Sequence, residues 1–238
     1  MTLANKIAFF LICALVVFTT LVYGTVHQPI IAIFYFFAAV LLVLWAIDGF
    51  ASSTLRYSPN LLQIPLYGAA VYGFVQVIPF GSIAETAGIS GIPRTISSDP
   101  FATRVAALHF FSFAVLFSTS LVIVDSAKRI RRLTAVITVF GFAYAFFAIL
   151  QSVLSPDKIY GIYAALAPFG SFVNRHNFAA FMEMSVALPT GLLFTGAIKR
   201  DKRLLYITAI ALMGAALLLS GSRGGLMAFL AEIILLVM

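Results

Sequence analysis

Apolar residues form long runs along this chain, and short polar segments separate each run from the next. Within a run the residues are apolar on every side, without the alternation of apolar and polar positions that marks a strand. A run of about 20 apolar residues crosses the ~30 Å hydrocarbon core of a bilayer as a helix. The pattern therefore predicts eight transmembrane helices. They cover residues 7–23, 30–47, 61–80, 105–124, 133–153, 178–198, 204–219 and 225–238.

The eighth run is shorter than the others, with 14 residues before Met238. This length falls short of a full span. We therefore expect the chain to be the N-terminal part of a longer protein. No repeat, low-complexity segment or linker divides residues 1–238, so a single transmembrane domain is expected over this range.

Composition agrees with the membrane pattern and excludes a soluble domain. Hydrophobic residues make up 62% of the chain and charged residues 10%, too few to cover a soluble exterior. The predicted fold class is an all-α, polytopic helical bundle of about eight spans, the last one truncated. The net charge of +7 does not indicate nucleic-acid binding, because the basic residues stand at the ends of the apolar runs.

The basic residues predict how the chain is oriented. Two dense clusters, at residues 128–132 and 199–203, fall in short loops on the same side, where the positive-inside rule is most reliable. That side also holds the N-terminus, and ten of the 15 Lys and Arg residues lie there. We therefore place the N-terminus in the cytoplasm.

Three of the arginines on the outer side stand at the start of a predicted helix: Arg104, Arg175 and Arg223. A cation at a helix N-terminus opposes the macrodipole, at a cost of a few tenths up to ~1 kcal/mol. An anion bound nearby explains the placement, because backbone N–H groups and the planar guanidinium fork both suit phosphate oxygens. The alternative is that each arginine reaches the lipid headgroups. We prefer that alternative for Arg104, whose surroundings are ordinary.

Two polar motifs surround the other two arginines. Arg223 stands in Ser220-Gly221-Ser222-Arg223-Gly224-Gly225, whose glycines let a ligand come close to the backbone. Arg175 stands in Asn174-Arg175-His176-Asn177, where either asparagine could simply cap the helix. His176 is a possible base, although a hydrogen-bonded interface histidine is the commoner case. The candidate phosphate-binding residues are Arg175, Arg223, Asn174, Ser222 and Gly224, with Arg104 as a weaker candidate.

Glu183 is an acid inside a predicted span, seven residues after His176 and on the same helical face. Acids in spans usually face the bundle interior. Glu183 could pair with an arginine of another helix or be protonated, and both structural and functional roles stay open. The sequence has no P-loop, nucleotide fingerprint or metal-ligand spacing, so no cofactor or metal is expected.

Two outer loops are long enough to have structure, over residues 81–103 and 154–177. In the first, Asp99 suits a helix N-cap and Pro100 the first helical position. The second is predicted to lie on the membrane surface as an amphipathic stretch.

The motifs Gly170-Ser171-Phe172-Val173-Asn174-Arg175-His176-Asn177-Phe178-Ala179 and Ser220 to Gly225, in this order and spacing, resemble the O-antigen ligase/polymerase superfamily. Residues 96–103 also look like the outer segment that precedes a helix in that family. The specific part of the resemblance lies within residues 170–238. The family more often reads Asn-Arg-Asn-His where this chain has His176 before Asn177.

This resemblance implies an integral glycosyltransferase of the bacterial inner membrane, active on the periplasmic face in lipopolysaccharide and polysaccharide biosynthesis. Such proteins move a glycan from undecaprenyl pyrophosphate to lipid A-core, to another carrier-linked glycan or, in relatives, to protein. The resemblance implies that outward arginines hold the pyrophosphate and that no metal or cofactor takes part. It places the general base in a large outer loop beyond residue 238, so the catalytic residues stay unassigned and this chain alone is expected to be inactive.

Two alternatives from other classes stay open. A small-anion transporter would place broken helices near the midplane, and Pro65 and Pro189 give this weak support. A scaffold without an active site would use glycines such as Gly141 and Gly214 for helix packing alone. Ligase, polymerase and protein glycosyltransferase share the carrier-binding part, so the sequence does not decide between them.

Overall fold

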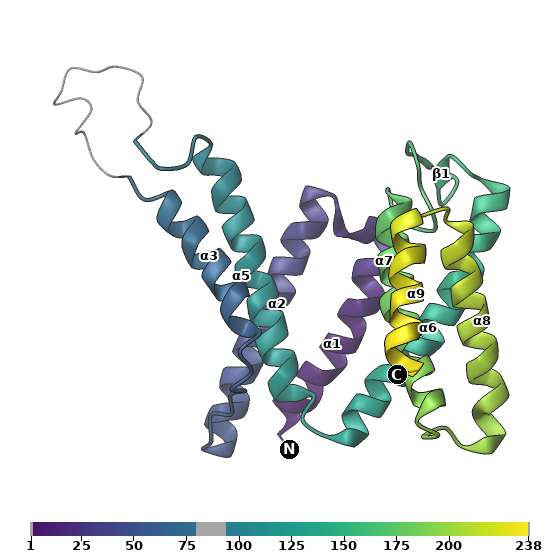
Figure 1. Cartoon of the computed structure of the whole chain (residues 1–238). Helices are drawn as coiled ribbons and strands as arrows, with labels where there is room; N and C mark the ends of the chain where they lie inside the picture. Colours follow the sequence, from purple (N-terminus) through teal and green to yellow (C-terminus); the bar gives the residue numbers. More distant parts are fainter. Residues whose placement is uncertain (1, 80–93, 238) are drawn as a thin grey trace. The chain divides into compact units, whose positions relative to one another are not determined.

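The computed structural model describes residues 2–79 and 94–237, and this part of the chain is almost entirely helical (Figure 1). The predicted all-α bundle is confirmed. Residues 81–93 of the first predicted outer loop lie outside the described residues. Eight α-helices lie within the described part: α1 (Leu3–Leu21), α2 (Gln28–Ser52), α3 (Gln63–Gln76), α5 (Pro100–Ile123), α6 (Ala127–Leu154), α7 (Arg175–Phe194), α8 (Arg203–Leu219) and α9 (Arg223–Val237).

Six helices of the described residues are long and apolar enough to cross a membrane. They are α1, α2, α5, α6, α7, and α8 together with the short 3-10 helix η2 (Arg200–Lys202) that precedes it. The other two are shorter, with 14 residues in α3 and 15 in α9. The architecture is that of a multi-pass membrane protein.

The contacts divide the chain into two compact units. Unit 1 comprises residues 1–11 and 32–124, and unit 2 comprises residues 12–31 and 125–238. The prediction of a single domain stays a prediction. In unit 1, α3 packs along α5, and Gly73 faces Ala107 so closely that a methyl group on the glycine would lie 2.8 Å from the alanine Cβ. Small residues permit this close approach of two helices.

A buried carboxylate organises one end of unit 1. Asp48 is only 5% exposed, and its carboxylate accepts hydrogen bonds from the Thr2 hydroxyl (2.5 Å), Asn5 Nδ2 (2.8 Å) and Arg56 Nη2 (2.7 Å). A buried charge is costly unless it is paired and hydrogen-bonded. Here three donors and one ion pair compensate it, so the network stabilises the fold.

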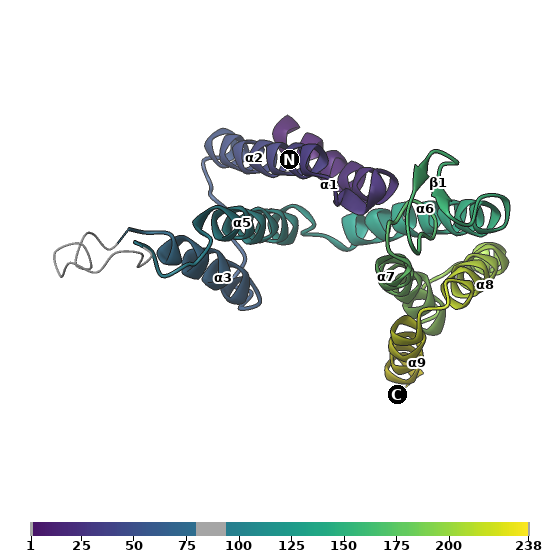
Figure 2. The same ribbon diagram turned by 90° about the horizontal axis from the view of Figure 1, so that it is seen from above.

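In unit 2, α7 contacts α6, α8 and α9 (Figure 2). Its core includes Phe178 and Met182 of α7 and Met213 and Leu217 of α8, all fully buried. Helix α7 begins at Arg175, three residues before the predicted start at 178, because Asn174 adopts an extended backbone and caps the helix. In unit 1, α5 has the predicted start, with Asp99 as N-cap and Pro100 in the first turn.

The segment between α6 and α7 is not one continuous amphipathic stretch, and its place on the membrane surface stays a prediction. It contains a small antiparallel hairpin of β1 (Lys158–Ile159) and β2 (Tyr163–Ala164). Buried polar contacts hold the segment: the Tyr144 hydroxyl bonds to Ser171 Oγ (2.6 Å), and the Gln151 amide bonds to both Gly170 O and Tyr160 N. Glycine and proline content alone could not reveal these partners, which come from distant parts of the chain.

Candidate functional site

The two polar motifs meet in unit 2, where α7 begins and where α8 turns into α9. We call residues 174–176 and 220–225 together the arginine corner. His176 Nδ1 and Ser222 Oγ, 46 positions apart in sequence, are 2.9 Å apart. The Arg175 guanidinium reaches the turn as well, since its Nη1 lies 3.6 Å from where a Cβ would stand on Gly221.

Close packing of α7 against α9 makes this meeting possible. A methyl group on Gly225 would lie only 2.6 Å from the Ala179 Cβ, nearer than side-chain carbons approach. Glycine and alanine at this contact therefore let the two helix starts come together. The turn before α9 also needs glycine, because Gly221 has a φ of +66°.

The first turn of α7 has its backbone N–H groups already occupied. Arg175 N donates to Ala167 O (2.9 Å), and His176 N donates to the Asn174 side chain (2.8 Å). The next two amides, of residues 177 and 178, donate to the Asn174 carbonyl. The expectation of free amides at the start of every outward helix is thus wrong for α7, because Asn174 and the preceding loop occupy them.

The first turn of α9 is different. Gly225 N donates to Ser222 Oγ (3.2 Å) and Leu226 N to the Ser222 carbonyl (3.0 Å), which makes Ser222 the cap of this helix. The amides of Arg223 and Gly224 have no hydrogen-bond partner in the part of the chain that the structure describes. Free amides at a helix N-terminus favour an anion.

Both guanidinium groups of the corner belong to exposed residues. Within residues 2–79 and 94–237, neither Arg175 nor Arg223 has a carboxylate or hydrogen-bond partner for its side chain. Space is also available, since no atom lies within 4 Å of a methyl group built on Gly224. The start of α9 therefore offers two free amides beside open space, and the corner adds two guanidiniums that have no partner among the described residues. Such a set of donors suits an oxyanion with several oxygens.

Ser222 connects the two helix starts. It is 4% exposed, and its hydroxyl oxygen accepts from Gly225 N while it shares a hydrogen bond with His176 Nδ1. When the hydroxyl donates to Nδ1, the imidazole is neutral and Nε2 carries its proton. The arrangement then adds an imidazole N–H donor beside the two arginines.

Glu183 has no ion pair with an arginine among the described residues. Glu232 of α9 lies close enough to Glu183 for the two carboxyl groups to interact. One oxygen of Glu232, Oε1, is buried without a hydrogen-bond partner in the described part. Arg223 lies on the same helix as Glu232 and does not pair with it.

Arg104 is an exposed residue of unit 1 and the fifth residue of α5, one turn after the helix begins. The other candidates, Arg175, Arg223, Asn174, Ser222 and Gly224, all lie in the arginine corner of unit 2. The participation of Arg104 in the same site stays a prediction.

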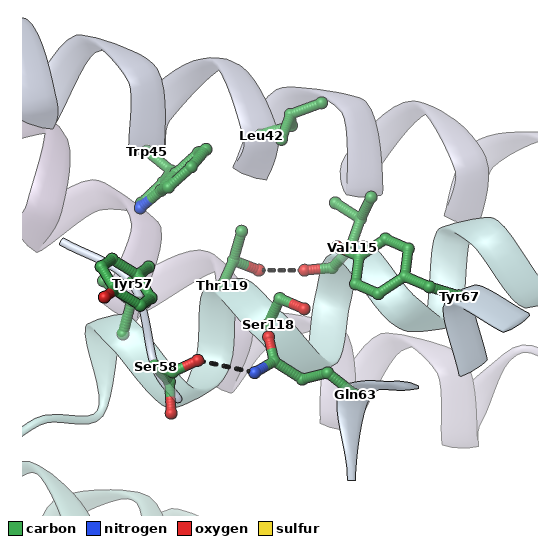
Figure 3. Close-up of a pocket in the computed structure, with 10 residues that line it drawn as sticks. Leu42, Trp45, Tyr57, Ser58, Gln63, Tyr67, Val115, Ser118 and Thr119 are labelled. Carbon is green, nitrogen blue, oxygen red and sulfur yellow. Dashed lines mark hydrogen bonds between the residues drawn. The ribbon is translucent and has the colours of Figure 1, made fainter. Parts of the chain in front are cut away.

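Unit 1 contains a cavity of about 150 Å³ between α2, α3, α5 and the segment at residues 57–58. In Figure 3, Trp45 and Tyr57 lie on one side of it and Tyr67 on the other. The Ser118 hydroxyl at its wall is buried and has no partner among the described residues. The lining holds no charged side chain, so it does not suit a phosphate.

No protein-family model, curated protein or solved structure matches this chain. Among the described residues, no group of three or more His, Cys, Asp or Glu side chains is placed to hold a metal ion. The chemistry of the arginine corner therefore has to be argued from its own geometry. Sequence reasoning found its arginines and glycines but missed the His176–Ser222 bond. The only signal for that bond was the presence of both residues in polar motifs.

Proposed function

We propose that this protein acts in the biosynthesis of bacterial envelope polysaccharide and binds a glycan carried on undecaprenyl pyrophosphate, as an O-antigen ligase-like protein of the inner membrane. The observation that supports this most is the group of four donors without partners at the arginine corner. Two come from the guanidiniums of Arg175 and Arg223, and two from the amides of Arg223 and Gly224. Their number and spread suit a pyrophosphate better than a single carboxylate.

The position of the corner at helix starts supports a membrane-anchored ligand. The six apolar helices place the protein in a bilayer, and the corner lies where α7 and α9 begin. With the N-terminus in the cytoplasm, these helix starts face the periplasm. A polyprenyl tail would then stay in the bilayer while its pyrophosphate reaches the arginines.

The proposed reaction is transfer of the glycan to an acceptor hydroxyl. The bond between the sugar anomeric carbon and a pyrophosphate oxygen breaks, and that oxygen keeps the electron pair. The acceptor oxygen forms the new bond to the anomeric carbon, and its proton goes to a base. Negative charge grows on the departing pyrophosphate, and the arginine corner would stabilise it there. No nucleotide is needed because the donor already has an activated leaving group.

Binding of undecaprenyl pyrophosphate to the chain in lipid nanodiscs tests the proposal. Arg175→Ala and Arg223→Ala should each lower the affinity about tenfold or more, because each removes charge-assisted hydrogen bonds. Lysine at either position should restore only part of the loss, since it lacks the planar fork. Arg200→Ala, which removes an exposed arginine of η2, is the matched control and should bind like the wild type.

Two outcomes would overturn the proposal. Equal binding by the wild type and both alanine variants would mean that the corner holds no pyrophosphate. Inorganic pyrophosphate that binds as tightly as the polyprenyl form would favour a small-anion site and, with it, the transporter alternative. In cells that carry the expected longer protein, both alanine variants should abolish glycan transfer and still insert into the membrane.

A further inference from the structure

Four aromatic rings gather on the outer side of unit 2, next to the hairpin labelled β1 in Figure 1. They belong to Tyr23, His27, Tyr160 and Tyr163, which we call the tyrosine cluster. Tyr23 lies at its centre, with ring centroids 5.2 Å from His27, 5.9 Å from Tyr160 and 5.3 Å from Tyr163, all edge to face. His27 and Tyr163 are also in contact, at 5.2 Å. The side chains of Tyr160 and Tyr163 remain open to the outside, since each residue is 38% exposed.

The backbone that carries these rings is strained. Tyr23 has a φ of +53°, Thr25 of +60° and Tyr160 of +54°. A non-glycine residue in this left-handed region costs about 1–2 kcal/mol, so the rest of the fold must hold it there. The Tyr160 hydroxyl donates to Leu21 O, and Tyr160 N donates to the buried Gln151 side chain (3.0 Å). The turn at Gly24 rests directly on the Phe172 ring.

This arrangement differs from what an interfacial anchor requires. Tyrosines that anchor a helix need only an apolar ring and a hydroxyl at headgroup level. Such a role does not require three left-handed residues or rings that pack on one another. Fixed rings at a strained turn are instead typical of a surface that must keep one shape for a ligand.

The cluster is joined to the arginine corner by a short stretch of chain. Ala167 accepts the Arg175 N–H at 2.9 Å, and Tyr163 stands four residues before Ala167. Four residues of fully extended chain reach at most ~14 Å, so the Tyr163 backbone lies within that distance of Ala167. A ligand that extends from the corner by a few chemical groups would meet the cluster.

We infer that the tyrosine cluster binds sugar rings of the glycan that is attached to the pyrophosphate in the arginine corner. This inference rests on the proposed function, because it needs a carrier-linked glycan as the ligand. One face of a pyranose presents C–H groups, which pack favourably on the electron-rich faces and edges of aromatic rings. The neighbouring Asp157 and Lys158 are exposed and offer an acceptor and a donor for sugar hydroxyls.

The Tyr160 phenol of the cluster is neutral at ordinary pH. Partial burial, and after it the nearby Tyr23, raises the pKa of the Tyr160 phenol above its usual value. The phenol therefore stays protonated and keeps its hydrogen bond to Leu21 O. A neutral phenol suits a neutral sugar ring.

The test compares two probes in nanodiscs: undecaprenyl pyrophosphate alone, and undecaprenyl pyrophosphate carrying a short N-acetylglucosamine oligosaccharide. The wild type should bind the sugar-bearing probe about three- to tenfold more tightly, the size of one or two aromatic contacts. Tyr163→Ala should lose this gain and keep the affinity for the bare carrier. Tyr163→Phe should keep the gain, and Tyr163→Leu should lose most of it. Tyr57→Ala, at a 79% exposed tyrosine of unit 1, is the control.

The outcomes separate this inference from the proposed function. Arg223→Ala should weaken both probes by the same factor, and if it weakens neither, the proposed function fails. If the wild type binds both probes equally, or if Tyr163→Leu keeps the full gain, the tyrosine cluster is an apolar membrane contact and the inference is wrong. Thermal unfolding of each variant shows whether the fold is intact, and His27→Ala provides a second variant that does not alter the hairpin.

Discussion

Two charged sites, one in each unit, are arranged in opposite ways. In unit 1, Asp48 is buried and every part of its carboxylate is engaged by Thr2, Asn5 and Arg56. In unit 2, Arg175 and Arg223 are exposed and have no partner in the described part of the chain. The first arrangement compensates a charge within the protein, whereas the second leaves two charges available to something outside it.

This difference separates structural from functional charge on physical grounds. A charge that the protein itself neutralises contributes to folding, and its removal leaves buried donors unsatisfied. A charge placed against the helix macrodipole with no partner contributes nothing to folding and gains its partner only from a ligand. A variant that removes the charge of Asp48 should therefore lose stability. A variant that removes Arg175 or Arg223 should instead lose ligand binding and keep its stability.

The largest expected effect is at the compensated charge. Asp48→Ala should lower the free energy of unfolding by about 3 kcal/mol, because it removes the ion pair with Arg56 and the hydrogen bond from the buried Asn5 amide. Denaturation in mixed micelles would measure this. Asp201→Ala, which removes an exposed acid of η2, is the control and should change the value by less than about 0.5 kcal/mol. If Asp48→Ala lowers the free energy of unfolding no more than Asp201→Ala does, the Asp48 network does not stabilise the fold.

The next effect is at the contact that assembles the arginine corner. Gly225→Ala places a methyl group 2.6 Å from Ala179 Cβ and should cost about 1–3 kcal/mol of stability. It should also weaken binding of undecaprenyl pyrophosphate, since α9 must move away from α7. Gly224→Ala meets nothing within 4 Å and should be neutral or slightly stabilising. Equal behaviour of the two variants would show that the close contact is not needed.

Ser222 should give a smaller effect. Ser222→Ala removes the cap of α9 and should cost about 1 kcal/mol. A double-mutant cycle with His176→Ala isolates the bond between the two side chains, which should couple them by about 0.5–1.5 kcal/mol. Additive single effects would mean that this hydrogen bond does not contribute.

The smallest change in stability is expected at the free charges, and it has the opposite sign. Arg223→Ala should raise the free energy of unfolding by a few tenths of a kcal/mol, because it relieves a cation at a helix N-terminus. The same variant should lose binding of undecaprenyl pyrophosphate. If Arg223→Ala destabilises the protein by more than about 1 kcal/mol, the arginine has a structural partner and the comparison between the units fails.

Much of the fold could be predicted from the sequence, because apolar runs of span length can form only helices in a bilayer. Local signals also indicated Asp99 as a cap and either Asn174 or Asn177 as another, and the structure shows Asp99 and Asn174 in these roles. The hairpin before α7 could not be predicted, since the partners that hold it, Tyr144 and Gln151, lie on another element.

The arginine corner shows the same limit. Arg175 and Arg223 were identified from the sequence because a cation at a helix N-terminus opposes the macrodipole. The occupied amides of α7 and the bond between His176 and Ser222 depend on how α7 meets α9, and no spacing along the chain reveals that. The best sequence indication of the contact between α7 and α9 was a pair of small residues, Gly225 and Ala179, which permit close packing of two helices.

The Ser222 oxygen has a thermodynamic consequence for the pair of helices. The same atom accepts from an N–H group in the first turn of α9 and shares a hydrogen bond with the imidazole on α7. The packing of α9 on α7 and the geometry of the proposed anion site are therefore coupled. A ligand that binds only the docked arrangement must add its binding free energy to the docking. Helix association and ligand affinity are therefore linked functions, and the separation of α9 from α7 should require more heat or denaturant as ligand concentration rises.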